Sequence, residues 1–272
     1  MQNQKLEPRK ALNKAFLKVK PNRSDIDKFK YNLIKLLDAV NEAESEEFHK
    51  NLVADFLKNT YYSPQHFVNT KGRKDLVIHN GKDAKSSVGV ILEAKKPTNK
   101  TEMLKVDNLN AKALQELLLY FLRDRLTDNN LEIKHLIVTN LYEWFIFDAQ
   151  VFEKCFIQNK DLVEKFTNFE AGKLSGKTTD FFYREIAAPA IDAITGEMSF
   201  TYFDIRDYES CLRNNEQQDD SKLISLFKLL SPEHLLKLPF ANDSNSLDKA
   251  FYSELLHLIG LTEIKERSEE HT

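Results

Sequence analysis

Two short apolar runs with a polar loop between them constrain the fold most. Residues 76–79 read LVIH and residues 88–94 read VGVILEA, and an Asn-Gly pair opens the intervening loop. Apolar runs of this length, rich in β-branched residues and joined by turn residues, are typical of a β-hairpin. The second run leads into Glu93 and Lys95, so an acid and a base end a strand that otherwise reads as buried.

The segments around this hairpin predict an α/β fold. The order helix, strand, strand, helix, strand, strand is typical of a mixed sheet flanked by helices. Hydrophobic periodicity predicts helices over 8–20, 24–40, 44–59 and 107–127, and further strands over 133–139 and 144–147.

After residue 150 the pattern becomes mainly helical. Polar linkers separate the apolar segments there. We therefore expect two parts: an α/β domain over residues 1–165 and a mainly helical extension over 166–272. In the second half, the pattern predicts helices near 150–170, 179–188, 220–230 and 246–259, and one strand near 200–205.

Composition excludes several classes of protein. The two cysteines, Cys155 and Cys211, form no CxxC pair, so neither a disulfide framework nor a cysteine-based zinc site is expected. No apolar run is long enough to cross a membrane, and the N-terminus does not read as a secretory signal. These features predict a cytoplasmic protein. The net charge of −3 gives no overall basic field, but basic residues cluster between residues 71 and 105.

The hairpin predicts a cluster of charged groups with a chemical use. Side chains two residues apart on a strand share a face, so Glu93 and Lys95 lie together. Antiparallel pairing brings Asp75, at the start of the first strand, beside Glu93. Two carboxylates with the Ala94 carbonyl are oxygen ligands that suit Mg²⁺, with Mn²⁺ as a substitute. Lys95 would then orient or help deprotonate a water, or offset charge on a phosphate. The alternative is a solvated ion pair without catalytic use.

The spacing of these residues resembles a known nuclease motif. Asp75 followed by Glu93-Ala94-Lys95 is similar to the D…(E)xK core of the PD-(D/E)XK nucleases, although Lys74 stands where that motif has Pro. A narrower likeness covers most of the chain. The stretches SEEFHKNLVADFLKNTYY, GRKDLVIHN, VGVILEAKKP, NAKALQELLLYFLRDR and HLIVTNLYEWFIFD resemble the N-terminal nuclease region of Type IIG restriction–modification enzymes, and SLDKAFYSELLHLIGLTE resembles their helical connector.

This resemblance implies a restriction-endonuclease-like fold and a Mg²⁺-dependent endonuclease that hydrolyses phosphodiester bonds in double-stranded DNA. The sequence carries no Gly-rich cofactor loop and no NPP[YF] motif. The module is therefore expected to act without its own methyltransferase half, beside a methyltransferase and specificity domain in the same or a neighbouring bacterial chain. One catalytic set cuts one strand, so duplex cleavage predicts a transient dimer on DNA.

The resemblance also implies further site residues. An acid on the first core helix would complete the metal site, and Glu47 is the preferred candidate, followed by Glu46 and then Glu44. Gln115, on the helix after the ExK strand, would contact the phosphate or a water. The alternatives are a solvated acidic helix start and a surface glutamine.

Basic residues near the hairpin are candidate phosphate ligands. Contacts of this kind need charge but carry no base specificity. Ordinary solvated loop lysines are the alternative. The candidates are Lys71, Arg73, Lys74 and Lys96.

Two other functions remain open at this point. The same fold could serve a repair or recombination nuclease that cuts structured DNA, which a preference for junctions or flaps would reveal. A non-catalytic, nuclease-like DNA-binding scaffold would instead fail to bind Mg²⁺ or Mn²⁺.

Overall fold

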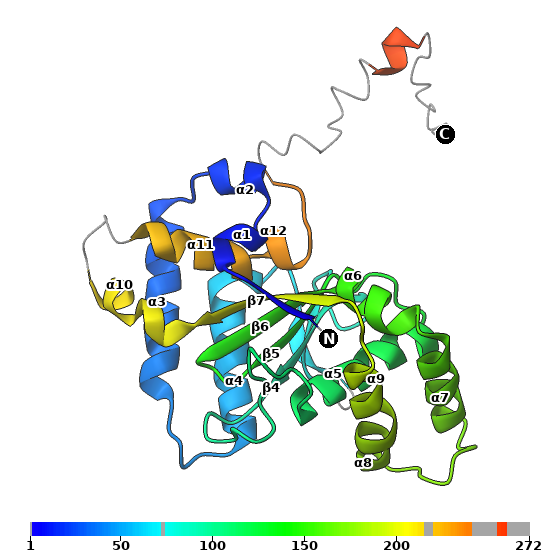
Figure 1. The fold of residues 1–272 in the computed structure, drawn as a ribbon. Helices are drawn as coiled ribbons and strands as arrows, with labels where there is room; N and C mark the ends of the chain where they lie inside the picture. The colour runs from blue at the N-terminus through cyan, green and yellow to red at the C-terminus, as the bar shows by residue number, and fades with distance from the viewer. Residues whose placement is uncertain (1, 72–73, 215–219, 241–254, 260–272) are drawn as a thin grey trace, which may run out of the picture.

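A seven-stranded mixed sheet forms the centre of the protein (Figure 1). The structure is a computed structural model that describes residues 2–71, 74–214, 220–240 and 255–259, apart from the side chains of residues 2, 71, 74 and 75. The strands are β1 (Gln2–Leu6), β2 (Val68–Lys71), β3 (Lys74–His79), β4 (Val88–Ala94), β5 (His135–Thr139), β6 (Glu143–Asp148) and β7 (Glu197–Asp204).

The strand order is β1-β7-β6-β5-β4-β3-β2, with both parallel and antiparallel neighbours. β3 and β4 form the expected antiparallel hairpin, and β4 runs parallel to β5 after the crossover through α5 (Lys112–Leu122). β1 is parallel to β7 at one edge. The prediction of a mixed sheet flanked by helices is confirmed.

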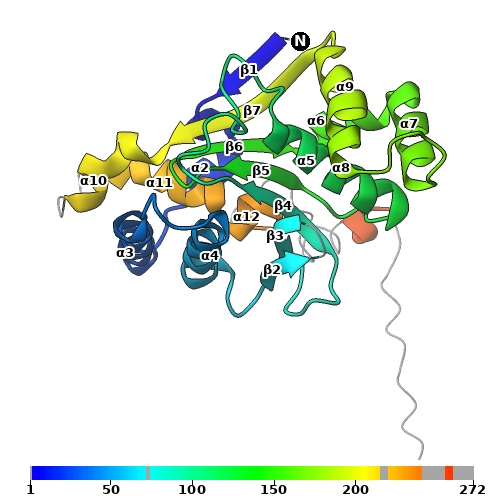
Figure 2. The same cartoon turned by 90° about the horizontal axis from the view of Figure 1, so that it is seen from below.

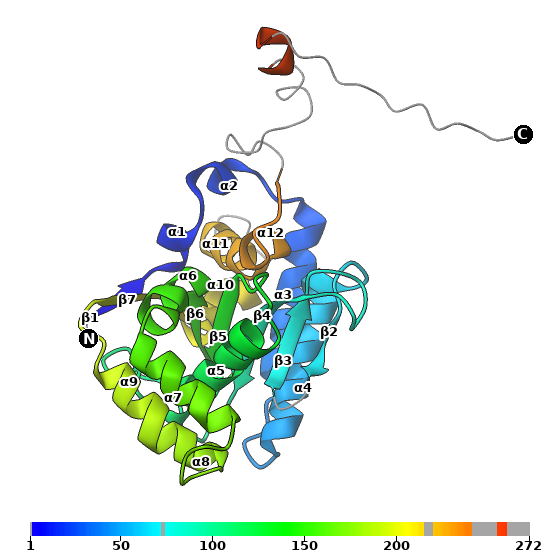
Figure 3. The same ribbon diagram turned by 90° about the vertical axis from the view of Figure 1, so that its right-hand side faces the viewer.

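Helices cover both faces of the sheet. Figure 3 shows the sheet between these two layers of helices. Each layer has its own apolar core against the sheet. One layer holds α3 (Arg23–Ala39), α4 (Glu46–Leu57), α10 (Glu209–Arg213), α11 (Asp220–Leu230) and α12 (Pro232–Leu235). The other holds α5, α6 (Ala149–Phe152), α7 (Lys160–Glu170), α8 (Thr179–Phe181), η4 (Phe182–Ala187) and α9 (Ala188–Asp192).

The alternation along β4 assigns each side chain to one layer. Val90, Leu92 and Ala94 belong to the core under α3 and α4, whereas Ile91 belongs to the core under α5. Because successive side chains on a strand point to opposite faces, Glu93 and Lys95 face α5. All seven residues of β4 are buried, so both faces of this strand are covered by helices.

The chain after residue 165, expected to be a mainly helical extension, contributes the strand β7 to the same sheet. β7 pairs with β6 on one side and with β1 on the other. α11 contributes Leu223, Leu226 and Leu229 to the core under α3 and α4. Figure 2 shows β7 lying along β1 at the edge of the sheet. Of the predicted helix over 246–259, residues 246–254 lie outside the described residues, and residues 255–258 are helical.

Some local boundaries differ from the predictions. The strands β1 and β2 were not predicted from the sequence pattern, because neither shows a clear apolar alternation. The predicted helix over 8–20 is two short helices, α1 (Pro8–Ala11) and α2 (Lys14–Lys18). Asn13 separates them, since its side chain accepts hydrogen bonds from Ala15 N and Phe16 N and so caps α2.

The helix that follows β4 begins later than predicted. It starts at Lys112 rather than at residue 107, because Met103, Leu104 and Leu109 are buried as parts of a loop. This loop therefore packs its apolar side chains into the core beside α5. None of the helices in the described part of the chain combines the length and the apolar character needed to span a membrane.

Candidate active site

The ammonium of Lys95 lies between two buried carboxylates at the end of β4. Its Nζ is 2.7 Å from Glu93 Oε1 and 2.6 Å from Glu116 Oε2 on α5. The exposed fractions are 3% for Lys95 and 2% for Glu93. Charged side chains are seldom buried so completely unless they are paired, and here each charge has an opposite charge in contact.

Two further acids surround the same ammonium at longer range. Glu46 Oε1, at the start of α4, lies 3.7 Å from Lys95 Nζ, and Glu102 Oε2 lies 3.8 Å from it. Lys112 is 2.7 Å from Glu102 Oε1 and 3.9 Å from Glu116 Oε1. These six residues, Glu46, Glu93, Lys95, Glu102, Lys112 and Glu116, are called the Lys95 cluster below.

Backbone contacts hold the end of β4 in position. The N–H of Lys95 donates to Thr139 O at 2.7 Å, which extends the β4–β5 ladder beyond Ala94. The N–H of Lys96 donates to Glu46 Oε2 at 3.2 Å, so the first turn of α4 lies against the end of the strand. Ala94 itself is buried and paired with Thr139 in the ladder.

The surroundings keep Lys95 charged. Burial by itself would lower the pKa of this lysine, but the negative charges of Glu93 and Glu116 outweigh it and raise the pKa well above its ordinary value. Lys95 in this arrangement therefore holds its proton, and it can attract an anion but cannot accept a proton. Burial would likewise raise the pKa of Glu102, yet hydrogen bonds from Lys112 and Asn99 lower it.

The Lys95 cluster carries an excess of negative charge. Four carboxylates against two ammonium groups give a formal charge of −2. Carboxylate oxygens and this charge suit a hard divalent cation such as Mg²⁺ in kind. Among the side chains that the structure describes, however, no three His, Cys, Asp or Glu residues are arranged to hold a metal ion. The ammonium of Lys95, rather than a vacant position, lies between Glu93 and Glu116.

The backbone places Asp75 next to this cluster. Leu76 pairs with Leu92 in the antiparallel register of β3 and β4, so position 75 falls opposite Glu93. The side chain of Asp75 lies outside the described part of the structure. The same holds for Lys71 and Lys74, and Arg73 is outside the described residues altogether.

Two of the predicted site residues lie elsewhere. Glu47 forms an ion pair with Lys50, and the side chain of Glu47 is 62% exposed. The position beside Lys95 that was expected for Glu47 is held by Glu46. Gln115 donates from Nε2 to Asn110 Oδ1 at 2.9 Å, and the neighbouring residue Glu116 faces the cluster instead. The acids that contact the cluster therefore stand one position before Glu47 and one position after Gln115 in the sequence.

Lys96, a predicted phosphate ligand, is half-buried beside the cluster. The hydrogen bond from the N–H of Lys96 to Glu46 holds the backbone of Lys96 just beyond the end of β4.

Glu102, Lys112 and Glu116 were not among the predicted site residues. Glu116 carried a usable signal, because it is an acid inside the apolar run LQELLLYFL, and a charge on such a helix needs a partner. Glu102 carried none, since its position depends on the fold of a loop. That loop places it through Asn99, whose Nδ2 donates to Glu102 Oε2 at 2.9 Å.

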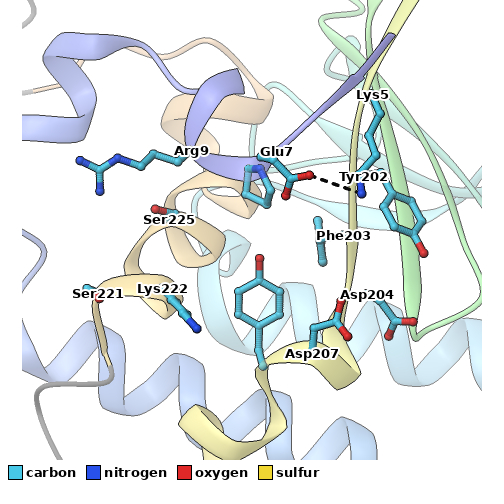
Figure 4. A pocket seen from close by; sticks show the side chains of 12 residues that line it. Lys5, Glu7, Arg9, Tyr202, Phe203, Asp204, Asp207, Ser221, Lys222 and Ser225 are labelled. Carbon is cyan, nitrogen blue, oxygen red and sulfur yellow. Dashed lines mark ion pairs between the residues drawn. The ribbon is translucent and has the colours of Figure 1, made fainter. Parts of the chain in front are cut away.

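A separate pocket of about 410 Å³ lies at the other side of the sheet, where β1, β7 and α11 meet (Figure 4). β6 and β5 separate β7 from β4, so this pocket is not part of the Lys95 cluster. Its charges balance and favour neither an anion nor a cation. The charged residues that line it are Lys5, Arg9, Lys222, Glu7, Asp204 and Asp207.

Comparison with known proteins gives a family and no function. A family model described as a domain of unknown function (DUF7149) matches residues 6–243. This match spans most of the chain and covers every residue of the Lys95 cluster. None of the curated proteins and none of the solved structures compared with the chain matches it.

Proposed function

The chain belongs to the DUF7149 family of unknown function, and we propose that it is a Mg²⁺-dependent DNA endonuclease module of a restriction–modification enzyme. The observation that supports this most is the position of Lys95 between the carboxylates of Glu93 and Glu116 at the end of a buried strand. The register that puts position 75 opposite Glu93 supports it further, because it supplies the second carboxylate of the nuclease-like motif.

Four residues of the cluster, together with Asp75, have a role in this proposal. Asp75 and Glu93 would hold the metal ion, and Glu116 and Glu46 would set the position of Lys95. The chemistry that Mg²⁺ supplies when bound is polarisation of a phosphate oxygen and a lower pKa for a bound water. Lys95, which keeps its proton, stabilises negative charge on the phosphate group and orients a water molecule through its N–H donors.

The substrate would approach from the exposed side of the cluster. Lys95 and Glu93 are buried, whereas the side chains of Glu46 and Glu102 are 42% and 29% exposed. These two acids therefore form the outer edge of the site, between the start of α4 and the loop before α5. A phosphate that reaches Lys95 must pass them, and a divalent cation would offset their charge.

A purely structural role is the competing explanation. A buried ion-pair cluster can hold β4 against α5 without any catalysis, since each of its charges has a partner. The two explanations differ in what they predict for metal binding and for DNA cleavage.

Nicking of supercoiled plasmid in MgCl₂ or MnCl₂ tests the proposal. Wild type is expected to nick the plasmid, and EDTA or Lys95→Met should abolish nicking. The matched control is Lys100→Met, which removes an exposed lysine from the following loop and should leave the rate unchanged. Equal nicking by wild type and Lys95→Met would refute the assigned site.

Calorimetry with MnCl₂ provides a readout that does not depend on turnover. Wild type should bind the ion, and Glu93→Gln should weaken binding by about 10-fold or more. If wild type neither binds the ion nor nicks DNA, the Lys95 cluster is structural and the protein is a scaffold.

The plasmid-nicking assay also tests the proposed partners, which are a specificity domain and a second copy of the module. Sequence recognition is assigned to a methyltransferase and specificity domain, so the module alone should nick without sequence preference. One catalytic set per chain predicts nicks before linear product, and the rate of linearisation should rise with the square of protein concentration if a transient dimer forms.

A further inference from the structure

A second polar pocket lies beside α5, on the same layer as the Lys95 cluster. It has a volume of about 520 Å³. One wall comes from α5 and its continuation η2 (Arg123–Thr127), and the other from the loop before α8, the start of α8 and η4. The residues that line it are Tyr120, Arg123, Lys177, Thr178, Thr179 and Tyr183.

The helix α5 connects this pocket to the Lys95 cluster. Glu116, Tyr120 and Arg123 follow one another at spacings of four and three residues, which places them on one face of the helix. A rise of about 1.5 Å per residue puts Tyr120 roughly 6 Å and Arg123 roughly 10 Å from Glu116 along the axis. Glu116 contacts Lys95, so the pocket begins about one turn along α5 from the cluster.

Tyr183 shows the same proximity from the opposite wall. Burial raises the pKa of Tyr183 to about 12, and the charges of Glu116 and Glu93 contribute in the same direction. A hydrogen bond with Thr179 and the charge of Arg123 act in the opposite direction.

The charge of the pocket is opposite to that of the cluster. Its lining residues include the cations Arg123 and Lys177 and no acid. Lys177 is exposed and, among the residues that the structure describes, makes no ion pair. Arg123 donates from Nε and Nη2 to Glu170 Oε1, which leaves its remaining N–H groups available.

We propose that this pocket binds a backbone phosphate of the DNA strand, next to the phosphate that lies at Lys95; the inference rests on the proposed nuclease function. Arg123 and Lys177 supply the positive charge, and the hydroxyl groups of Thr178 and Thr179 supply neutral donors. Thr178 Oγ1 already accepts a hydrogen bond from Phe181 N, and its own O–H remains a donor.

The chemistry of the lining favours a phosphate over a base. Tyr120 and Tyr183 are each 8% exposed, so their rings present little surface on which a base could stack. Lys177, the N–H groups of Arg123 that Glu170 leaves available and two hydroxyl groups are instead the donors that a phosphate needs. The substrate thus places one anion near the acidic cluster and a neighbouring anion in the cationic pocket.

DNA binding without divalent metal tests this inference separately from cleavage. Wild type, Lys177→Gln and the control Lys173→Gln are titrated in EDTA against a fluorescent 30-bp duplex, by anisotropy at several salt concentrations. Lys173 is an exposed lysine of the same loop that does not line the pocket. Lys177→Gln should weaken binding several-fold and reduce the slope of log K against log[salt] by about 1.

Cleavage kinetics add a second readout. Lys177→Gln should raise KM with little change in kcat, because the pocket binds ground state and transition state alike. Equal affinity and equal salt slope for wild type and Lys177→Gln would overturn the inference, as would the same loss in Lys173→Gln. If Lys177-dependent binding holds but wild type does not cleave, the nuclease function fails and the phosphate site stands.

Discussion

Lys95 Nζ and Glu116 Oε2 lie 2.6 Å apart, although one residue ends a strand and the other lies in the middle of a helix. This contact crosses the interface between the sheet and α5, so it fixes the direction in which the lysine points. Because the ion pair is buried, removal of one partner leaves the other charged group without compensation. Its loss should therefore affect both the position and the pKa of Lys95.

Glu116→Gln tests this relationship. The substitution keeps the shape of the side chain but removes the charge that holds Lys95, and we expect DNA nicking to fall by about 10-fold or more. Gln115→Ala is the matched control, because Gln115 contacts Asn110 rather than the cluster. Initial nicking rates at saturating Mg²⁺ measure the difference. Equal losses of nicking rate in both variants would show that nicking depends on the integrity of α5 and not on the Lys95–Glu116 ion pair.

Glu46 and Glu47 form a second matched pair. Glu46 contacts Lys95 and the backbone of Lys96, whereas Glu47 is exposed and pairs with Lys50. Glu46→Gln should therefore lower the affinity for Mn²⁺, measured by calorimetry, and Glu47→Gln should leave it within about twofold. The reverse order would restore Glu47 as the acid of the site.

Lys228 is a test of stability rather than of function. It is 2% exposed, and its Nζ donates to Phe16 O at 2.6 Å, Leu17 O at 3.0 Å and Val19 O at 2.5 Å. Lys228→Met would leave these carbonyls without that donor, and we expect the free energy of unfolding to fall by about 2–4 kcal/mol.

Urea denaturation measures this loss. The control is Lys222→Met, which removes an exposed lysine from the same helix and should change stability by less than about 0.5 kcal/mol. A similar small effect for Lys228→Met would mean that water replaces its ammonium.

His135 predicts a loss of stability in mild acid. Burial lowers its pKa from 6.5 to about 4, against the opposing charge of Asp148 and its hydrogen bond with Leu235 O. Since the folded-state pKa is the lower one, the stabilisation is complete above pH 6.5 and is lost as the pH falls toward 4. The full shift corresponds to about 3 kcal/mol.

His135→Asn, which keeps a neutral donor, should flatten the decline in melting temperature between pH 7 and pH 4. The ring of His234 lies 4.8 Å away, and its pKa is lowered in the same direction, so part of the decline should remain. Glu233 and Lys237 also face this region. His257→Asn, at an exposed position, is the control and should retain the full decline.

The sequence predicted the strand half of the site better than the helix half. β4 has the predicted bounds, and its two-residue period placed Glu93 and Lys95 on one face correctly. On a helix, a shift of one residue rotates the side chain by about 100°. The acids that contact the cluster, Glu46 and Glu116, each stand one position away from the predicted residues Glu47 and Gln115.

The apolar pattern of α5 does not show which of its side chains faces the cluster. Residues 116–122 are all buried, because this helix lies between the sheet and the surrounding helices. The sequence of a helix that is apolar on all sides does not reveal which face meets the site. Glu102 was out of reach for another reason, since a long loop sets its position. The pairing of β7 with the sheet was also out of reach, because it joins segments that are far apart in the sequence.

The pairing of β1 with β7 has a consequence for synthesis in the cell. Gln2–Leu6 leaves the ribosome long before its partner Glu197–Asp204, because β2 to β6 lie between them in the sequence. The edge of the sheet therefore cannot close during early elongation, and such contacts between distant segments form slowly. Until then β7 is missing and the outer side of β6 has no neighbour, a state in which strands of nascent chains can associate with one another.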